Sequence, residues 1–320
     1  MTEAFLHSSL DNPKNFLLAL HPLGIRGDII LEKHYSRHLK KKSRISPSQL
    51  IASASEVWGQ PNYFVSVCTF NQFPFICHFK QTNMLWVSIP ITKKISTKEI
   101  DEIKTKISWE LNSVKAVTGC PIPLWSFALF DGESLSFFWI LEKPICSTDF
   151  YKWFQCQKTL YSLLRGKFKL NQTSLDPTQS IRVIGSLNPA IPYFVRLEEN
   201  RSRIFNFSEL KSPLLKLSGK LLSDDICEHH DWNIRFNWLI AVLENRFWIP
   251  NRCPKQSKYW FLFLALSISF FCPVYCLERE LKVIAELIEG KKWPLIESKY
   301  SPLIMEFKRN VMPALDCFSW

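Results

Sequence analysis

Residues 174–189 read SLDPTQSIRVIGSLNP and contain a predicted short strand over residues 180–184, followed by a turn. Arg182 lies on this strand, and Ser186 and Asn188 lie in the turn, where their side chains would suit contacts with phosphate and sugar groups. An arginine on a strand also commonly forms an ion pair that holds the strand to a helix. Both roles therefore stay open for Arg182.

The same stretch lies in the most basic part of the chain. The 320 residues carry 40 Lys and Arg against 29 Asp and Glu, a net charge of +11. Residues 151–220 hold 12 basic and 4 acidic residues, so most of the excess positive charge falls in this segment. Within it, the sequence RGKFK places Arg165, Lys167 and Lys169 around Phe168. Cations interleaved with aromatic residues are typical of proteins that bind single-stranded nucleic acid through phosphate contacts and base stacking.

A second basic strip occupies residues 33–44 and contains no acidic residue. We expect this strip to run along a helix or a loop. A solvated surface and a contact with nucleic acid are equally good interpretations of it. Its members are Lys33, His34, Arg37, His38, Lys40, Lys41, Lys42 and Arg44.

Composition and missing motifs exclude several classes of protein. With 47% hydrophobic and 22% charged residues, the chain is globular rather than disordered. It has nine glycines and neither G-x-G-x-x-G nor a P-loop motif, which excludes the dinucleotide fingerprint and the P-loop enzymes. The absence of His-x-His argues against a rolling-circle nickase, and the absence of G-x-S-x-G argues against a serine hydrolase.

The N-terminus shows no secretory signal, so we expect a cytoplasmic protein whose ten cysteines are reduced. Cys227, His229 and His230, with cysteines downstream, could supply zinc ligands. They lack the close first pair of ligands that structural zinc sites use, so we expect buried thiols and no structural metal.

Hydrophobic patterns predict an α+β body followed by a helical tail. Asp131-Gly132 marks the turn of a hairpin, and Ser96 with Glu99 forms a capping box at the start of a long helix. Everything after Asp224 reads as helical. The predicted strands are residues 63–70, 84–91, 126–130, 135–141 and 180–184, and the predicted helices are residues 15–20, 46–58, 96–117 and 147–164.

This order predicts two domains, an α+β domain over residues 1–215 whose first sixty residues are helix and loop, and a helical domain over residues 216–320. Residues 259–277 form an uncharged run of nineteen residues, long enough for a membrane span. However, Pro273 should end the helix near Phe271, and an amphipathic helix capped at Gly290 follows. A buried helix is therefore expected there, and a membrane partner is not.

Three segments resemble motifs of the archaeo-eukaryotic-type primases, in particular the divergent primase–polymerases of plasmids and phages. In that family one strand carries an Asp-x-Asp metal site, a hairpin carries a histidine, and an aspartate precedes an Arg-x-x-Gly-Thr-x-Asn element. Here Asp176 precedes the Arg182–Asn188 segment, DGESLSFFWILEKP (131–144) is similar to the hairpin, and MLWVSIPI (84–91) lies where the metal strand belongs. The resemblance covers residues 10–210. It implies a primase-like mixed domain, an RRM-like sheet with helices, followed by an all-helical C-terminal region.

Most metal-binding residues of that family are missing from this chain. The resemblance places Ser88 and Pro90 at the two aspartates and Ser136 at the histidine, and leaves Asp176 as the matching acid. Two divalent ions need several carboxylates, so one aspartate cannot hold the Mg²⁺ or Mn²⁺ that an active enzyme would use. Asp131 and Glu133 on the hairpin turn could substitute, although acids on turns are usually solvated.

Three functions stay open. The favoured one is a plasmid- or phage-type DNA replication protein with weak or no catalysis, which binds single-stranded DNA and contacts other replication proteins through its helical C-terminal region. The second is an active metal-dependent DNA primase, a nucleotidyltransferase with Asp176 as a catalytic residue. The third is a non-enzymatic interaction or peripheral membrane protein that uses residues 259–277. The residues expected to bind nucleotide or nucleic acid are Arg165, Lys167, Lys169, Arg182, Ser186 and Asn188.

Overall fold

The protein is described by a computed structural model that covers residues 10–35, 40–71, 74–91, 95–189, 193–221, 239, 242, 257–269, 272 and 274–318. The chain divides into two compact units. The first unit consists of residues 1–74 and 79–226, and the second consists of residues 75–78 and 227–320. Strands and helices occur together in the first unit, which confirms the predicted α+β class.

The larger sheet of the first unit has five antiparallel strands in the order β11-β6-β7-β5-β4. β6 and β7 form the predicted hairpin, and Gly132 in its turn has a φ of 88°, which glycine tolerates without strain. The pairing of β5 with β7 places Ser88 opposite Ser136 and Pro90 opposite Ser134. The strands are β4 (Cys68–Phe70), β5 (Phe79–Pro90), β6 (Phe127–Phe130), β7 (Ser134–Cys146) and β11 (Arg196–Asn200).

A smaller sheet of four antiparallel strands has the order β2-β1-β3-β8. Its strands are β1 (Ile29–His34), β2 (Lys40–Ile45), β3 (Tyr63–Ser66) and β8 (Ser180–Arg182), and a further pair joins β9 (Leu187–Asn188) to β10 (Tyr193–Phe194). In the four-stranded sheet Lys42 lies opposite Glu32, Glu32 opposite Phe64, and Phe64 opposite Arg182. Because directly opposed residues share a face of a sheet, these four side chains form one row across all four strands.

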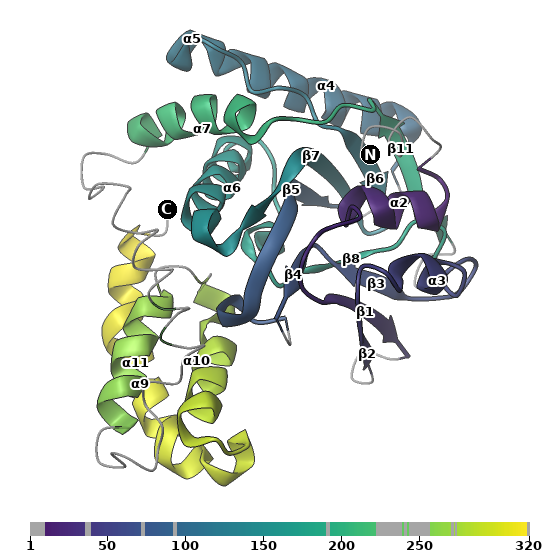
Figure 1. Ribbon diagram of the computed structural model, residues 1–320. Coiled ribbons are helices and arrows are strands. Elements are labelled where there is room, and N and C mark those ends of the chain that lie inside the picture. The colour runs from purple at the N-terminus through teal and green to yellow at the C-terminus, as the bar shows by residue number, and fades with distance from the viewer. Residues whose placement is uncertain are drawn as a thin grey trace. The chain divides into compact units, whose positions relative to one another are not determined.

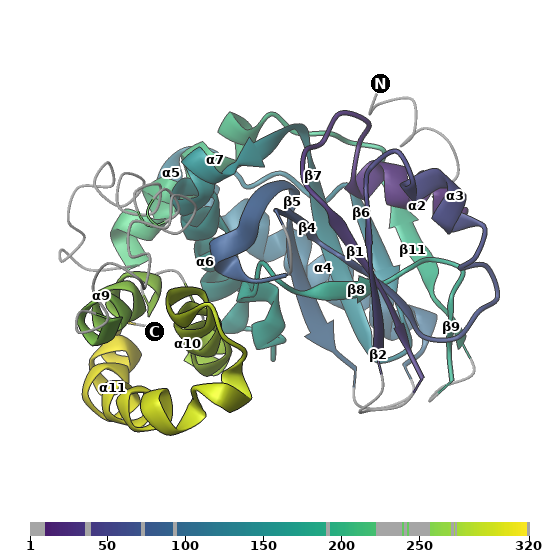
Figure 2. The same cartoon turned by 60° about the horizontal axis from the view of Figure 1, so that its bottom comes forward.

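Helices complete the first unit. The fully buried Trp153 of α6 packs on Trp86 of β5 with ring centroids 5.8 Å apart, and its Nε1 donates to the Met84 carbonyl at 2.8 Å. Figures 1 and 2 show α2 and α3 side by side, and Phe16 of α2 packs edge-on against Phe127 of β6. The helices are α2 (Pro13–Leu20), α3 (Leu50–Ala54), α4 (Thr97–Ser113), α5 (Lys115–Thr118), α6 (Phe150–Arg165) and α7 (Phe207–Leu221), with short 3₁₀ turns η2 (Ser147–Asp149) and η3 (Gln172–Leu175).

β4 pairs only with the first part of β5. Farther along β5, the backbone groups of Trp86 and Ser88 on this edge bond to α6 and to the segment around η3. Gln157 of α6 accepts the Trp86 N–H at 3.2 Å and donates to the Ser174 carbonyl at 2.6 Å. Ser174 Oγ accepts the Ser88 N–H at 3.0 Å, and the Asn171 N–H donates to the Ser88 carbonyl at 2.8 Å. These bonds satisfy the backbone of β5 and fix η3, which leads into Asp176, beside this strand.

The prediction of helix and loop over residues 1–60 is wrong in part. Residues 29–34 and 40–45 are strands, so the described part of the basic strip lies on β1 and β2, not on a helix or loop. Lysines on the edge strand β2 keep an exposed edge from pairing with other chains, while Ile29, Ile30 and Leu31 of β1 are buried.

Two further predicted elements differ from the structure. The helix expected over residues 46–58 is confined to α3, because the N–H groups of Glu56 and Val57 bond three residues back to Ser53 and Ala54, which makes turns. The strand expected over residues 63–70 is divided into β3 and β4, which belong to different sheets.

The described part of the second unit is helical, with α9 (Ser257–Ser269), α10 (Val274–Glu289), η5 (Trp293–Leu295) and α11 (Glu297–Phe318). As predicted, α9 ends before Pro273, and Gly290 follows α10 with a φ of 64°. The short turn η1 (Ile76–His78) also belongs to this unit, and the Ile76 N–H donates to Oε2 of the fully buried Glu280 at 3.1 Å.

Two sequence-based expectations concern residues 222–277. None of the helices in the described residues is long and apolar enough to cross a membrane. Cys227, His229 and His230, considered above as zinc ligands, lie outside the described residues.

Candidate functional site

Charged and aromatic side chains gather on one face of the four-stranded sheet, which we call the polar face. Glu32 lies at its centre, with Oε1 2.9 Å from Lys42 Nζ and Oε2 2.9 Å from His34 Nε2. The His34 ring stacks on Phe64 with centroids 4.2 Å apart, and the Arg182 guanidinium carbon lies 4.6 Å from the centroid of the same ring. The members of the polar face are Glu32, His34, Lys42, Phe64 and Arg182.

The charges of the polar face shift the titration of two of its members. Burial raises the pKa of Glu32, but hydrogen bonds from His34 and Lys42 outweigh this and leave the pKa below its ordinary value. Burial also lowers the pKa of His34, and the positive charges of Lys40 and Arg182 lower it further, against the opposing effect of Glu32. At neutral pH His34 is therefore neutral and Glu32 is charged.

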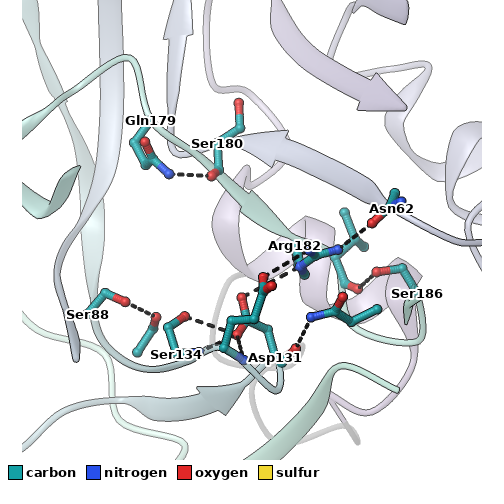
Figure 3. A network of polar contacts seen from close by, with 12 residues as sticks. Asn62, Ser88, Asp131, Ser134, Gln179, Ser180, Arg182 and Ser186 are labelled. Carbon is teal, nitrogen blue, oxygen red and sulfur yellow. Dashed lines mark hydrogen bonds and ion pairs between the residues drawn. The ribbon is translucent and has the colours of Figure 1, made fainter. Parts of the chain in front are cut away.

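Arg182 joins the polar face to the turn of the β6–β7 hairpin. Its Nη1 donates to Asn62 Oδ1 at 2.8 Å, its Nη2 donates to Glu133 Oε2 at 3.1 Å, and its Nε lies 3.8 Å from Asp131 Oδ2. Figure 3 shows the guanidinium between Asp131 and Asn62. Asn62 has a φ of 57°, a left-handed conformation that asparagine adopts more readily than most residues. Arg182 thus forms ion pairs in this structure, but they join its strand to the turn of a hairpin and not, as the ion-pair interpretation had it, to a helix.

Asp131 is built into the turn itself. Its Oδ1 accepts the N–H groups of Glu133 at 2.9 Å and Ser134 at 2.6 Å, and the Ser134 hydroxyl at 3.1 Å. Burial raises the pKa of Asp131, against the lowering effect of these backbone N–H groups and of Arg182. The Asn188 amide donates to the Asp131 carbonyl at 3.0 Å, so the 182–188 segment holds the turn at two points.

Ser186 and Asn188, expected to contact nucleic acid, are fully buried. Ser186 Oγ donates to the Val183 carbonyl at 2.7 Å, and Asn188 bonds to the Asp131 carbonyl as described above. In this structure both side chains support the chain around Arg182.

Arg165, Lys167 and Lys169 are exposed at the end of α6. Lys167 Nζ lies 3.9 Å from Glu110 Oε1 of α4, and no contact described in the structure joins these residues to Arg182. Other cations of residues 151–220 form ion pairs on β11 and beyond it: Arg196 with Glu198, Arg201 with Glu199, and Arg203 with Glu209. The charge excess of this segment is thus spread over several elements.

The position expected for a metal carries hydroxyl groups. Ser136 Oγ donates to Ser88 Oγ at 2.9 Å across β7 and β5, and both serines are buried. Asp176 is also buried, and its Oδ1 accepts the N–H and the hydroxyl of Thr178 at 2.9 and 2.6 Å. Within the part of the chain that the structure describes, no three His, Cys, Asp or Glu side chains come together as metal ligands. Because Mg²⁺ and Mn²⁺ favour carboxylates, the residues present do not fit a two-metal site.

Sequence reasoning missed three members of the site, Glu32, Phe64 and Asn62. The basic strip and the Arg182 segment could each be found from their charge, but their meeting on one sheet depends on the pairing of β1 with β3 and of β3 with β8. Pairing between strands that are distant in the sequence, as β3 and β8 are, leaves no local pattern.

Among the comparisons with known proteins, only the search of solved structures found similar chains. No protein-family model matches the chain, and the search of curated proteins found no match. The chain is similar to the AEP domain of the cyanophage S-2L primase-polymerase, with 13% identity, a TM-score of 0.40, and 62% of this chain and 94% of that one covered. It is also similar to the primase RepB', with 11% identity, a TM-score of 0.41 and coverage of 93% and 92%. The catalytic domain of RepB' in complex with initiator DNA gives 11% identity, a TM-score of 0.41 and coverage of 66% and 95%.

Proposed function

We propose that this chain is a DNA-binding replication protein with a primase-like fold, of the plasmid or phage type, with weak or no nucleotidyl-transfer activity. One observation carries the proposal. The β6–β7 hairpin carries Ser136, whose hydroxyl bonds to Ser88 of β5 where metal ligands were expected, and its turn also contacts the arginine of a cationic and aromatic face. The polar face therefore offers cations and an aromatic ring for a nucleic acid, while the position of Ser88 and Ser136 lacks the negative charge that catalytic metal ions need.

The hydroxyl pair argues for weak catalysis on physical grounds. Each serine is neutral at physiological pH, and their mutual hydrogen bond satisfies one donor and one acceptor inside the protein. A pair of divalent cations would find no negative charge on these two side chains, and the single carboxylate of Asp176 would not offset the cost of removing both ions from water.

DNA binding is supported by the exposed cations of β2 next to the polar face. Lys40, Lys42 and Arg44 alternate along one side of this edge strand, and Lys40 and Lys42 are exposed. Phe64 with the stacked His34 ring offers an aromatic surface between these lysines and Arg182. Cations on both sides of an aromatic surface suit a single strand, whose bases can stack while its phosphates pair with lysine and arginine. The helical second unit would contact other replication proteins.

A salt titration tests the binding. We expect the full chain to bind labelled oligodeoxythymidine, with log K falling by about 0.7 per log unit of salt for each phosphate neutralised. The double variant Lys40→Gln/Lys42→Gln should bind more weakly and give a shallower slope, whereas Lys98→Gln/Lys115→Gln, which removes the same charge from α4 and α5, should change little. Binding that is absent, or that does not respond to salt, contradicts the proposal.

A primer-synthesis assay tests the loss of catalysis. On a single-stranded template with nucleoside triphosphates and either Mg²⁺ or Mn²⁺, we expect little or no primer, and EDTA should leave DNA binding unchanged. Metal-dependent synthesis that disappears in Asp176→Asn, with folding retained, would instead establish the active primase.

A further inference from the structure

The guanidinium of Arg182 is already surrounded by groups of its own chain. Its side chain is 9% exposed, its two terminal nitrogens donate to Asn62 and Glu133, and one side of it faces the Phe64 ring. A phosphate from outside can therefore reach Arg182 only if one of these groups moves.

The partners of Arg182 differ in how firmly they are held. The Asp131 carboxylate accepts three hydrogen bonds within the turn, so its removal would cost the turn its structure. Asn62 belongs to the backbone turn before β3, where its N–H donates to the Leu187 carbonyl at 2.9 Å. The side chain of Glu133 is 50% exposed, and the ion pair that the structure gives it among the described residues is the one with Arg182.

Glu133 also has the chemistry of a phosphate substitute. A carboxylate and a phosphodiester each carry one negative charge and accept hydrogen bonds from the same face of a guanidinium. An ion pair with a half-exposed carboxylate contributes little to stability, so a phosphate held at the same time by neighbouring lysines can replace it.

We propose that Glu133 occupies the place of a ligand phosphate on Arg182, and that a single-stranded DNA phosphate binds Arg182 by displacing this carboxylate. Glu133 thereby limits the affinity of the polar face for DNA and makes binding depend on neighbouring cations that hold the strand during the exchange. This inference rests on the proposed DNA-binding function and names the residue that regulates it.

The test compares Glu133→Gln with Glu102→Gln in the full chain, using labelled oligodeoxythymidine at low salt. Both changes remove one negative charge, but Glu102 is exposed on α4 and has no described contact with an arginine. We expect Glu133→Gln to bind about two- to fivefold more tightly than the natural chain, with an unchanged salt dependence, because the same number of phosphates is neutralised in both proteins. Glu102→Gln should match the natural chain.

The double variant Glu133→Gln/Arg182→Lys shows whether the gain passes through Arg182. Lysine keeps the charge but not the forked geometry, so the gain should disappear, and thermal melting should verify that each variant is folded. Equal affinity of Glu133→Gln and Glu102→Gln would overturn the inference while leaving DNA binding in place. Failure of every folded variant and of the natural chain to bind DNA would overturn the proposed function itself.

Discussion

A single buried histidine makes the stability of the first unit depend on pH. His21 follows α2, is 1% exposed, and its Nε2 lies 2.8 Å from the Ser66 carbonyl. Burial lowers its pKa from 6.5 to about 4, and the bond to Ser66 opposes this only in part. Protonation of this side chain therefore favours the unfolded chain, where the imidazole is in water.

The direction of the pH effect follows from that shift. Above pH 6.5 His21 is neutral in both states and its contribution is unaffected. As the pH falls from 6.5 to about 4 the unfolded chain takes up the proton first, and we expect a loss of about 3 kcal/mol from the free energy of unfolding. Urea titrations across this range measure it, and His21→Gln should flatten the curve. A parallel decline in both proteins would contradict the assignment to His21.

At this scale the sequence was most informative about charge and least about burial. It identified Arg182 and left its phosphate and ion-pair roles open, and the structure adds its partners Asn62, Asp131 and Glu133. The burial of His21, Ser186 and Asn188 could not be foreseen, because a short polar residue looks the same in a turn on the surface and in a turn that is covered.

At the scale of elements, the turn between β8 and β9 requires a glycine at position 185 for two reasons, its backbone conformation and the lack of space for a side chain. Gly185 has a φ of 77°, and a Cβ at this position would lie 2.7 Å from Cε3 of Trp58. We expect Gly185→Ala to destabilise the protein by about 2–3 kcal/mol, from backbone strain of about 1 kcal/mol and the displacement of the Trp58 ring. A shifted turn would also move Arg182 and weaken DNA binding.

Gly119→Ala is the matched control for this change. Gly119 has a φ of 84° but nothing within 4 Å of an added Cβ. An alanine there would suffer the backbone strain of a positive φ but no steric clash. Urea unfolding should give a smaller loss for Gly119→Ala, and DNA affinity should not change. Equal losses would mean that the Trp58 ring moves aside at no cost.

Local rules predicted the elements that local interactions define. The Asp131-Gly132 pair predicted the hairpin of β6 and β7, and the capping box predicted the start of α4. In this box the Glu99 N–H donates to Ser96 Oγ at 3.3 Å, and Glu99 Oε2 accepts the Ser96 N–H at 2.9 Å. β2 was missed because KKKSRI has no apolar alternation and becomes a strand only through its pairing with β1. The division of residues 63–70 between two sheets is likewise a tertiary effect.

Considered as a whole, the chain crosses between its two units at three points of the sequence, after residues 74, 78 and 226. A boundary near residue 215 was predicted from the order of strands and helices along the sequence, and that boundary stays a prediction. The contribution of residues 75–78 to the second unit has no counterpart in any sequence pattern, because it consists of tertiary contacts such as the bond between Ile76 and Glu280.

Truncation should reveal this crossing. Ile76 is fully buried, and in a chain ending at residue 226 it would lose the helices of the second unit. We expect that shortened chain to self-associate in sedimentation measurements, and Ile76→Ser introduced into it to reduce the association, because an exposed isoleucine favours contacts between copies. A shortened chain that stays monomeric without the substitution would contradict this expectation.

Residues 75–78 also limit how the second unit can be exchanged among proteins. Since that unit is assembled from two separate stretches, residues 227–320 do not form a self-contained cassette that recombination or engineering can transfer in one piece. A recipient chain would need its own short segment, placed just before a strand equivalent to β5, with a backbone N–H for the carboxylate of Glu280. The two units are therefore expected to be inherited together and to change in step.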